Sequence, residues 1–221
     1  QEALDALLDM VAHGDIVLPE ARPIINLHCH TFFSFNGYGY SPTYLAWKSR
    51  CDGLLAAGIV DFDVLDAVDE FLAAARQVGL RACAGIETRV FVPQFATRVI
   101  NSPGEPGVSY HMGTGFTSCA VPDPDLLAEL KQVAQGRNRG ILERVNPFLA
   151  PVVVDYDDDV LPLTPNGNAT ERHICMAFDL KAKEVFPEPG PRAAYWAQKL
   201  GMDAVELGSI LDDAPTLQGF I

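Results

Sequence analysis

Two histidines separated by one residue are the first candidates for chemistry in this chain. In INLHCH, residues 25–30, His28 and His30 stand at the end of an apolar run. Residues two apart in a strand point to the same face, so the pair would aim two imidazoles at one point. Imidazole and carboxylate together bind divalent zinc, manganese or iron. The spacing therefore predicts a metal site at the end of a strand.

Further residues of metal-binding type stand near the ends of later predicted strands. Asp61 lies in the predicted strand IVDF, Glu87 ends the predicted strand LRACAGIE, and His111 follows another short apolar stretch. In parallel sheets and barrels, ligands gather at the carboxyl ends of the strands. A glutamate has two oxygens and can bridge two ions, which then clamp the attacking and leaving oxygens of a hydrolysis. The predicted ligands of such a two-ion centre are His28, His30, Glu87 and His111.

Structural roles are alternatives for two of the acidic residues. Asp61 is either a metal ligand or the cap of a helix that begins near Asp63. Glu87 would be costly to bury without a partner. It is therefore either a ligand or the ion-pair partner of Arg81 or Arg89.

The remaining histidines are open to several roles as well. His111 stands in a glycine-rich region and is either a ligand or an exposed residue. In TPNGNATERH, a turn precedes a helix that Asn168 or Thr170 would cap. A helix N-terminus beside Arg172 favours an anion, so Arg172 is a candidate for substrate binding. His173 is either a further metal ligand, a structural residue or a residue that faces substrate.

Strands and helices alternate along the predicted chain. Such alternation with short connections favours a parallel sheet or barrel. The predicted strands cover residues 23–28, 59–62 and 80–87, with a continuation of the last one beyond the glutamate. The predicted helices cover residues 2–13, 41–58, 63–79, 123–135, 137–148, 168–186 and 191–201.

Composition limits the classes of partner. The chain has 221 residues, of which 48% are hydrophobic, and a formal net charge of −13. A single core fits this length. The negative field disfavours nucleic acid and anionic membranes, whereas a small anionic substrate can still bind where a metal or arginines reverse the local charge. No apolar run reaches the ~18 residues of a membrane span, so no membrane partner is expected.

Cysteine usage and the N-terminus indicate the compartment. Five cysteines without a CxxC pair favour free thiols in a reducing, cytoplasmic environment. The N-terminal segment QEALDALLDM is acidic and lacks the basic start and apolar middle of a secretory signal. It also lacks an initiator methionine, so we expect a processed chain or a piece of a longer protein.

The order of four motifs resembles the PHP family (polymerase and histidinol phosphatase) over roughly residues 24–115. That family shows a strand ending in His-x-His, then a Gly with Asp-His, then Gly-x-Glu, and then a further His. The resemblance implies a metal-dependent phosphoesterase on an α/β fold, a distorted TIM-like barrel of seven strands. We expect that barrel at residues 23–221 after a helical extension at 1–22. The matching residues here are His28 and His30, Gly58 with Asp61, Gly85 with Glu87, and His111 in YHMG.

The chain departs from that pattern in ways that bear on the metal count. Phe62 stands in place of the histidine of Asp-His, and Phe35 in place of an acid or histidine after His-x-His. Both positions help to hold a third ion in three-metal members, so the resemblance implies two ions or a lost centre. The closing Asp-x-His is absent from residues 112–221, and the only later histidine is His173. Two interpretations follow: the chain is a fragment with an incomplete barrel, or the centre is degenerate.

These observations predict a metal-dependent hydrolase that acts on a small phosphorylated substrate. Phosphate oxygens would be held by Arg89, Arg98 or Arg172. One alternative is a PHP-like module that binds a ligand or partner domain without catalysis. Another is a metal hydrolase of C–N or C–O bonds, which the missing third-ion ligands leave open.

Overall fold

A computed structural model describes residues 2–221, which fall into two compact units. The first unit extends to Ala128 and combines a sheet with helices, whereas the second, Glu129–Ile221, is helical. The fold is therefore mixed α/β, as predicted. The domain boundary that we predicted after residue 22 stays a prediction.

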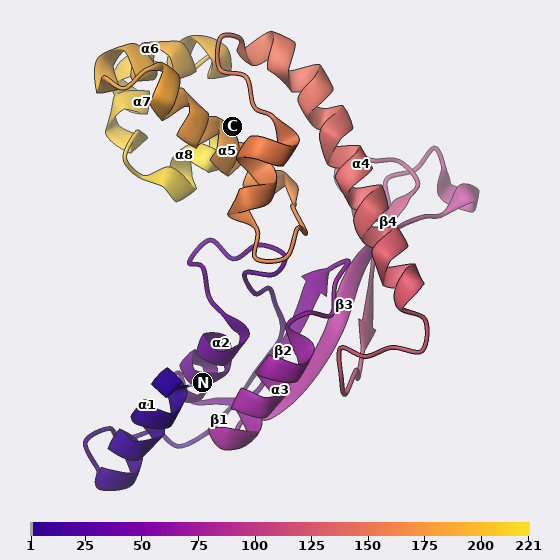
Figure 1. Ribbon diagram of the computed structural model, residues 1–221, viewed down its shortest axis with the longest axis vertical. Coiled ribbons are helices and arrows are strands. Elements are labelled where there is room, and N and C mark those ends of the chain that lie inside the picture. The colour runs from indigo at the N-terminus through magenta and orange to yellow at the C-terminus, as the bar shows by residue number, and fades with distance from the viewer. Residues whose placement is uncertain (1) are drawn as a thin grey trace. The chain divides into compact units, whose positions relative to one another are not determined.

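The first unit contains an open sheet of four strands in the order β1-β2-β3-β4 (Figure 1). β1 pairs with β2 and β2 with β3 in parallel, whereas β4 is antiparallel to β3. Helices α2 and α3 pack against each other and against the sheet. The strands are β1 (Arg22–Cys29), β2 (Leu54–Phe62), β3 (Arg81–Phe91) and β4 (Val108–Thr114). The helices are α1 (Glu2–His13), α2 (Pro42–Cys51), α3 (Val68–Gln77) and the short η1 (Pro93–Phe95).

Local sequence accounts for the close packing of this sheet. β2 is an almost wholly apolar segment whose middle is buried, as expected of a strand covered on both faces. α3 is amphipathic and places Phe71 fully inside. Gly85 allows β3 and β4 to approach closely, because a Cβ there would lie 2.3 Å from the carbonyl oxygen of Gly113. The glycine two residues before Glu87 thus permits the pairing that places this glutamate.

The structure corrects two element boundaries and leaves the barrel unconfirmed. The helix predicted for 41–58 ends at Cys51, because its last apolar residues start β2; short apolar runs have no period that separates helix from strand. The helix predicted from residue 63 begins at Val68. Across residues 2–221 there are four strands, all before Gly115, so the seven-stranded barrel stays a prediction.

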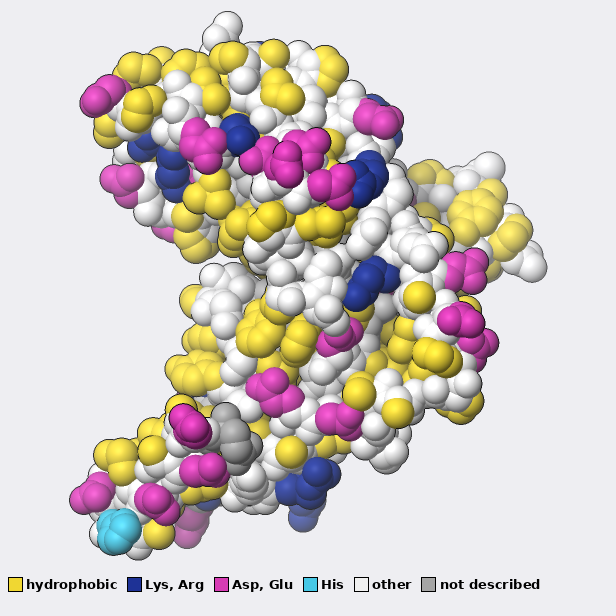
Figure 2. Space-filling view, in the orientation of Figure 1, with side chains coloured by type: hydrophobic (Ala, Val, Ile, Leu, Met, Phe, Trp, Pro, Cys, Tyr) yellow, Lys and Arg dark blue, Asp and Glu magenta, His cyan; other side chains and the backbone are white. Residues whose placement is uncertain are grey.

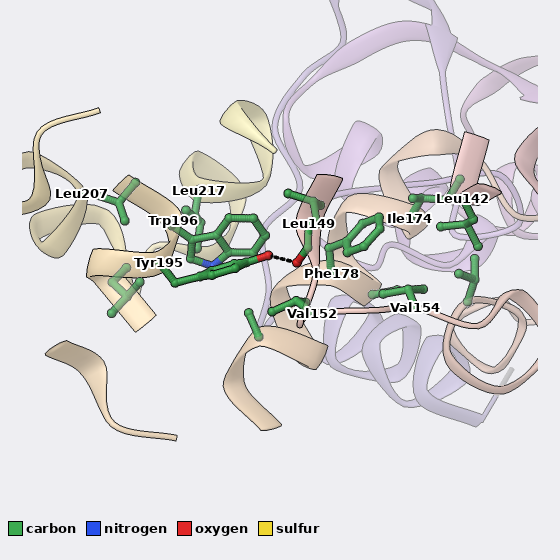
Figure 3. Close-up of a cluster of buried hydrophobic side chains, with 14 of the residues drawn as sticks. Leu142, Leu149, Val152, Val154, Ile174, Phe178, Tyr195, Trp196, Leu207 and Leu217 are labelled. Carbon is green, nitrogen blue, oxygen red and sulfur yellow. Dashed lines mark hydrogen bonds between the residues drawn. The ribbon is translucent and has the colours of Figure 1, made fainter. Parts of the chain in front are cut away.

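The second unit is a cluster of helices around one apolar core. α4 (Pro124–Leu149) is one continuous helix where two were predicted, and it runs from the first unit into the second. Trp196, Phe178 and Leu207 are almost completely buried in the core (Figure 3). The other elements are η2 (Tyr156–Val160), η3 (Leu161–Leu163), α5 (Glu171–Val185), α6 (Pro189–Leu200), α7 (Ala204–Ile210) and α8 (Ala214–Phe220).

A buried tyrosine ties α6 to the end of α4. The Tyr195 hydroxyl donates to the main-chain oxygen of Leu149, one of the last carbonyls of α4 (Figure 3). Tyr195→Phe is expected to lower the free energy of unfolding by about 1 kcal/mol, since it leaves that carbonyl unpaired. Urea denaturation measures this. Tyr38→Phe, at an 81% exposed tyrosine, serves as the control and should change stability by less than about 0.5 kcal/mol. Equal effects of the two substitutions would contradict the prediction.

Charge on the visible surface follows the composition. Figure 2 shows Asp and Glu side chains spread over this face of both units, with Lys and Arg in small groups.

Among the described residues, no helix is both long and apolar enough to cross a membrane. All five cysteines are present as free thiols.

Candidate metal centre

The structure brings together the His-x-His pair and the glutamate that the sequence predicted. Nε2 of His28 lies 3.0 Å from Oε2 of Glu87, and Nε2 of His30 lies 3.3 Å from the same oxygen. Within residues 2–221, these three side chains are the one group of three or more whose ligand atoms all lie within 4.8 Å of one another. Three convergent donors of this kind match the ligand sets of catalytic zinc sites.

Strand register explains why the three side chains converge. β1 and β2 pair through Asn26–Ala57 and then Cys29–Ile59, so β1 contains one extra residue around His28. Such a bulge turns a side chain away from its regular direction. On the other side, Glu87 pairs with Phe62, the last residue of β2. The glutamate of β3 therefore lies level with the carboxyl ends of the first two strands.

The three side chains of the cluster differ in their exposure to solvent. The side chain of His28 is 52% exposed, that of His30 is 23% exposed, and that of Glu87 is 7% exposed. An ion held by these three side chains would have the buried carboxylate on its interior side. On the side of His28 it would remain accessible to solvent. That is the arrangement of a centre with an open position, which substrate requires.

Electrostatics at His30 favour the neutral ring that metal binding needs. Burial lowers the pKa of His30; the nearby Glu87 carboxylate opposes this effect and His28 adds to it. A neutral imidazole presents a lone pair on one nitrogen. The meeting of imidazole nitrogens with a carboxylate oxygen is favourable when a cation sits between them. The donor set thus fits a divalent metal.

Asp61 holds the loop that follows the histidines. Its carboxylate accepts bonds from the Thr31 N–H, the Thr31 hydroxyl and the Ser34 hydroxyl, each at 2.7 Å. Burial raises the pKa of Asp61, and these donors oppose the rise. The predicted cap role is wrong, because α3 begins at Val68 with Ala67 as its N-cap residue. The predicted ligand role gains no support, because the carboxylate is engaged by this loop.

An aromatic side chain covers one side of the cluster. The ring of Phe62 stacks on that of His30, with centroids 4.5 Å apart and 20° between the planes. Phe62 in turn approaches Tyr110, at 5.9 Å between centroids. Phe62 therefore packs against a predicted ligand and fills the space beside it.

Two further predicted residues lie on β3 and β4. Arg89 forms an ion pair with Glu105 and lies 5.5 Å from the ring of Tyr110, so part of its charge is already neutralised. His111 pairs with Thr88, one residue from Glu87. Because side chains alternate along a strand, His111 faces away from Glu87, and it is exposed. The structure does not bring His111 into the cluster.

The other predicted residues lie outside the cluster as well. Arg98 is exposed in the connection between β3 and β4. His173 belongs to the second unit, where its Nδ1 accepts the N–H of Thr170 at 3.0 Å. Thr170, one of the two residues predicted as possible caps, is the N-cap residue of α5. Together with His173 it forms a capping box. Arg172 is exposed in the first turn of α5. Ligand and substrate roles for these residues stay predictions.

Sequence reasoning did not find the residues that support the histidines. Thr31 and Ser34 are completely buried and bind Asp61, yet they were not candidates. A signal was present: two hydroxyl residues enclose two phenylalanines in TFFS, directly after His30. Small polar residues inside an apolar segment need buried partners, and the buried Asp61 is such a partner.

No protein-family model matches the chain, and no curated protein matches it in sequence. Among solved structures, its fold is similar to that of a candidate metal-dependent phosphoesterase from Bifidobacterium adolescentis, with a TM-score of 0.56 and 20% sequence identity over 83% of this chain and 56% of that one. It is also similar to an amidohydrolase from Chromobacterium violaceum with bound sulfate and no metal. There the TM-score is 0.50 and the identity 18%, over 74% of this chain and 51% of that one.

These likenesses establish the class of fold. The chain shares a mixed α/β fold with two proteins described as hydrolases, and it carries a candidate metal centre of three side chains. It spans about half the length of those two proteins. Membership of the PHP family stays a prediction.

Proposed function

We propose that the chain is part of a metal-dependent hydrolase and that His28, His30 and Glu87 hold a divalent ion. The proposal rests on one observation, the convergence of two imidazole nitrogens on one carboxylate oxygen. The likeness in fold to a candidate metal-dependent phosphoesterase supports a phosphoester as the bond that is cleaved. The substrate would be small and anionic, because the ion supplies the positive charge that this acidic chain lacks.

Each side chain has a distinct part in that proposal. Glu87 is buried and supplies the negative charge that anchors the ion, while His30 is held by packing and hydrogen bonds. His28 is half exposed and lies on the side from which substrate would arrive. When bound, a divalent ion acts as a Lewis acid that polarises a phosphoryl oxygen and lowers the pKa of water.

The centre could hold one ion or two, and the two cases need different ligands. Three gathered side chains suffice for one ion with an open position. A second ion, of zinc, manganese or iron, would use the other oxygen of Glu87 and ligands from outside the cluster. Metal analysis separates these cases, because one ion per chain indicates the three-residue site and two indicate the bridged centre.

Metal content and activity test the proposal together. Protein stripped with a chelator, reloaded with zinc or manganese and dialysed should retain at least one ion per chain by mass spectrometry of the metals. The loaded protein should hydrolyse an aryl phosphate, and His28→Ala should lose that activity. Sub-stoichiometric metal in the unsubstituted protein would overturn the proposal. Metal binding without hydrolysis of any phosphoester would favour the non-catalytic module.

Hydrolysis of an amide bond is the second candidate. It is favoured by the likeness in fold to an amidohydrolase, and Phe62 in place of a third-ion ligand is compatible with it. A matched panel of aryl phosphates and anilides, assayed with the same metal-loaded protein, separates the two reactions. Turnover of anilides alone would replace the phosphoesterase proposal.

A further inference from the structure

We propose that a cavity lined by helices α1, α2 and α3 binds a small organic ammonium ion with an apolar body, of the arylalkyl amine class. The cavity lies in the first unit, and its lining includes none of the three side chains of the candidate metal centre. The inference therefore does not depend on the proposed function.

The size and position of the cavity suit a small ligand. Its volume is about 300 Å³, which lies within the range of small-molecule sites. α1 contacts α2, and α2 packs on α3, so three helices of one compact unit contribute to the wall (Figure 1).

Apolar side chains form most of the wall. Leu4 and Leu7 line it from α1, and Tyr44 and Trp47 line it from α2. Leu4 is 1% exposed and Trp47 is 9% exposed, so packing of the unit fixes both, whereas Tyr44 is 43% exposed. The leucines favour an apolar ligand body. The aromatic rings favour an apolar body as well, and their faces also attract a cation.

One carboxylate gives this wall a negative charge. Glu70 of α3 lines the cavity, and its Oε1 accepts the Thr43 N–H at 3.0 Å and the Thr43 hydroxyl at 2.7 Å. The two bonds hold the carboxylate against the first turn of α2. Oε2 of Glu70 takes no hydrogen bond from residues 2–221, so it is left for the N–H of an ammonium group, whose hydrogen bond to a carboxylate is charge-assisted.

The charges around the cavity favour a cation over an anion. Among the described residues, neither lysine nor arginine lines the cavity. α1 contains Glu2, Asp5 and Asp9 and has no lysine or arginine. Lys48 of α2 is bound to both carboxylate oxygens of Asp52, so its charge is paired. The field of a chain with a net charge of −13 further raises the local concentration of cations.

The two tryptophans make binding visible in a nuclear magnetic resonance spectrum. Trp47 lines the cavity, whereas Trp196 is fully buried in the core of the second unit. In ¹H–¹⁵N spectra of the full chain at about pH 7, where the amine is protonated, 2-phenylethylammonium should shift the Trp47 indole signal. The shift should saturate at millimolar ligand, and the Trp196 signal should stay in place. The neutral 2-phenylethanol and the anionic 3-phenylpropionate should bind at least about 10-fold more weakly.

Glu70→Gln isolates the carboxylate. Glutamine can still accept from Thr43 through its amide oxygen but has no negative charge. The substitution should weaken 2-phenylethylammonium binding by about 10-fold and leave 2-phenylethanol binding unchanged. Glu20→Gln is the matched control, because Glu20 is an exposed residue of the same unit outside the lining. It changes the net charge equally and should leave both affinities unchanged.

The unsubstituted protein alone can overturn the inference. Absence of a saturable shift at Trp47 would do so, and so would equal affinities for the amine and for 2-phenylethanol. Neither result depends on the folding of a variant. Equal losses of amine affinity in Glu70→Gln and Glu20→Gln would also overturn it, because the overall field and not Glu70 would then attract the cation. None of these measurements uses a metal, so failure of the proposed function would leave the expected results unchanged.

Discussion

Glu87→Gln is expected to weaken zinc binding on the order of 100-fold or more, because it removes the only charged group of the three-residue cluster. Loss of a residue that merely supports a ligand already costs about 10-fold to 100-fold. The substitution keeps the shape of the side chain, so the site stays packed while its charge disappears. Isothermal titration of metal-free protein with zinc measures the dissociation constant.

Thermal unfolding provides a second measurement of the same zinc binding. Zinc at about 100 times its dissociation constant should stabilise the unsubstituted protein by about 2.7 kcal/mol, because the ion binds the folded chain. Glu87→Gln should lose most of this gain. Glu105→Gln is the matched control, since Glu105 pairs with Arg89 outside the cluster and should leave zinc affinity unchanged. Zinc affinity that survives in Glu87→Gln would exclude this carboxylate as the anchor.

The core of the site could be predicted because it depends on short-range rules. His28 lies near the carboxyl end of β1 and His30 directly follows that strand, while Glu87 lies on β3, which is joined to β1 through the parallel pairs β1–β2 and β2–β3. Parallel order is the regular outcome when a helix connects two strands, as α2 and α3 do here. The sequence pattern therefore placed three residues at one edge of the sheet before any distance was known.

His111 lies outside the cluster because the connection before β4 differs from the helical connections before β2 and β3. Residues 92–107 contain only the three-residue turn η1, so the chain returns along β3 and β4 pairs antiparallel. Because β4 runs antiparallel to β3, its amino end and not its carboxyl end lies nearest to the carboxyl end of β3. The register pairs His111 with Thr88, so the side chain of His111 lies on the face of the sheet opposite to that of Glu87. A connection too short for a full helix can be recognised in a sequence, and it favours an antiparallel next strand. It therefore argues against placing a histidine of that strand at the same edge of the sheet.

Long-range hydrogen bonds could not be predicted from spacing. The bonds from Asp61 to Thr31 and Ser34 span 30 and 27 residues and depend on how the loop after β1 folds over the end of β2. An aspartate near a predicted helix is more often a cap, which is why sequence reasoning kept that role open. The second unit shows the opposite case. Its cap at Thr170 was predictable because a capping box is local.

His173 is expected to make the stability of the protein strongly dependent on pH. Burial lowers its pKa from 6.5 to about 4. Above the unfolded value the ring is neutral in both states, so its full contribution to stability is present. Between that value and about 4, the unfolded chain takes up a proton that the folded chain does not, and stability falls with pH. The loss between about pH 8 and about pH 4.5 amounts to about 2.5 kcal/mol from this residue alone.

His173→Gln isolates that contribution. Glutamine at the third helical position of a capping box can still accept the Thr170 N–H but does not titrate. Urea denaturation of both proteins at about pH 8 and about pH 4.5 gives four free energies, and the carboxylates titrate alike in both proteins. The unsubstituted chain should lose about 2.5 kcal/mol more than the variant on acidification. Parallel losses would mean that His173 is protonated in the folded state, which requires Nδ1 to give up its bond to Thr170. Because that bond needs a bare nitrogen, the expected result is the larger loss in the unsubstituted protein.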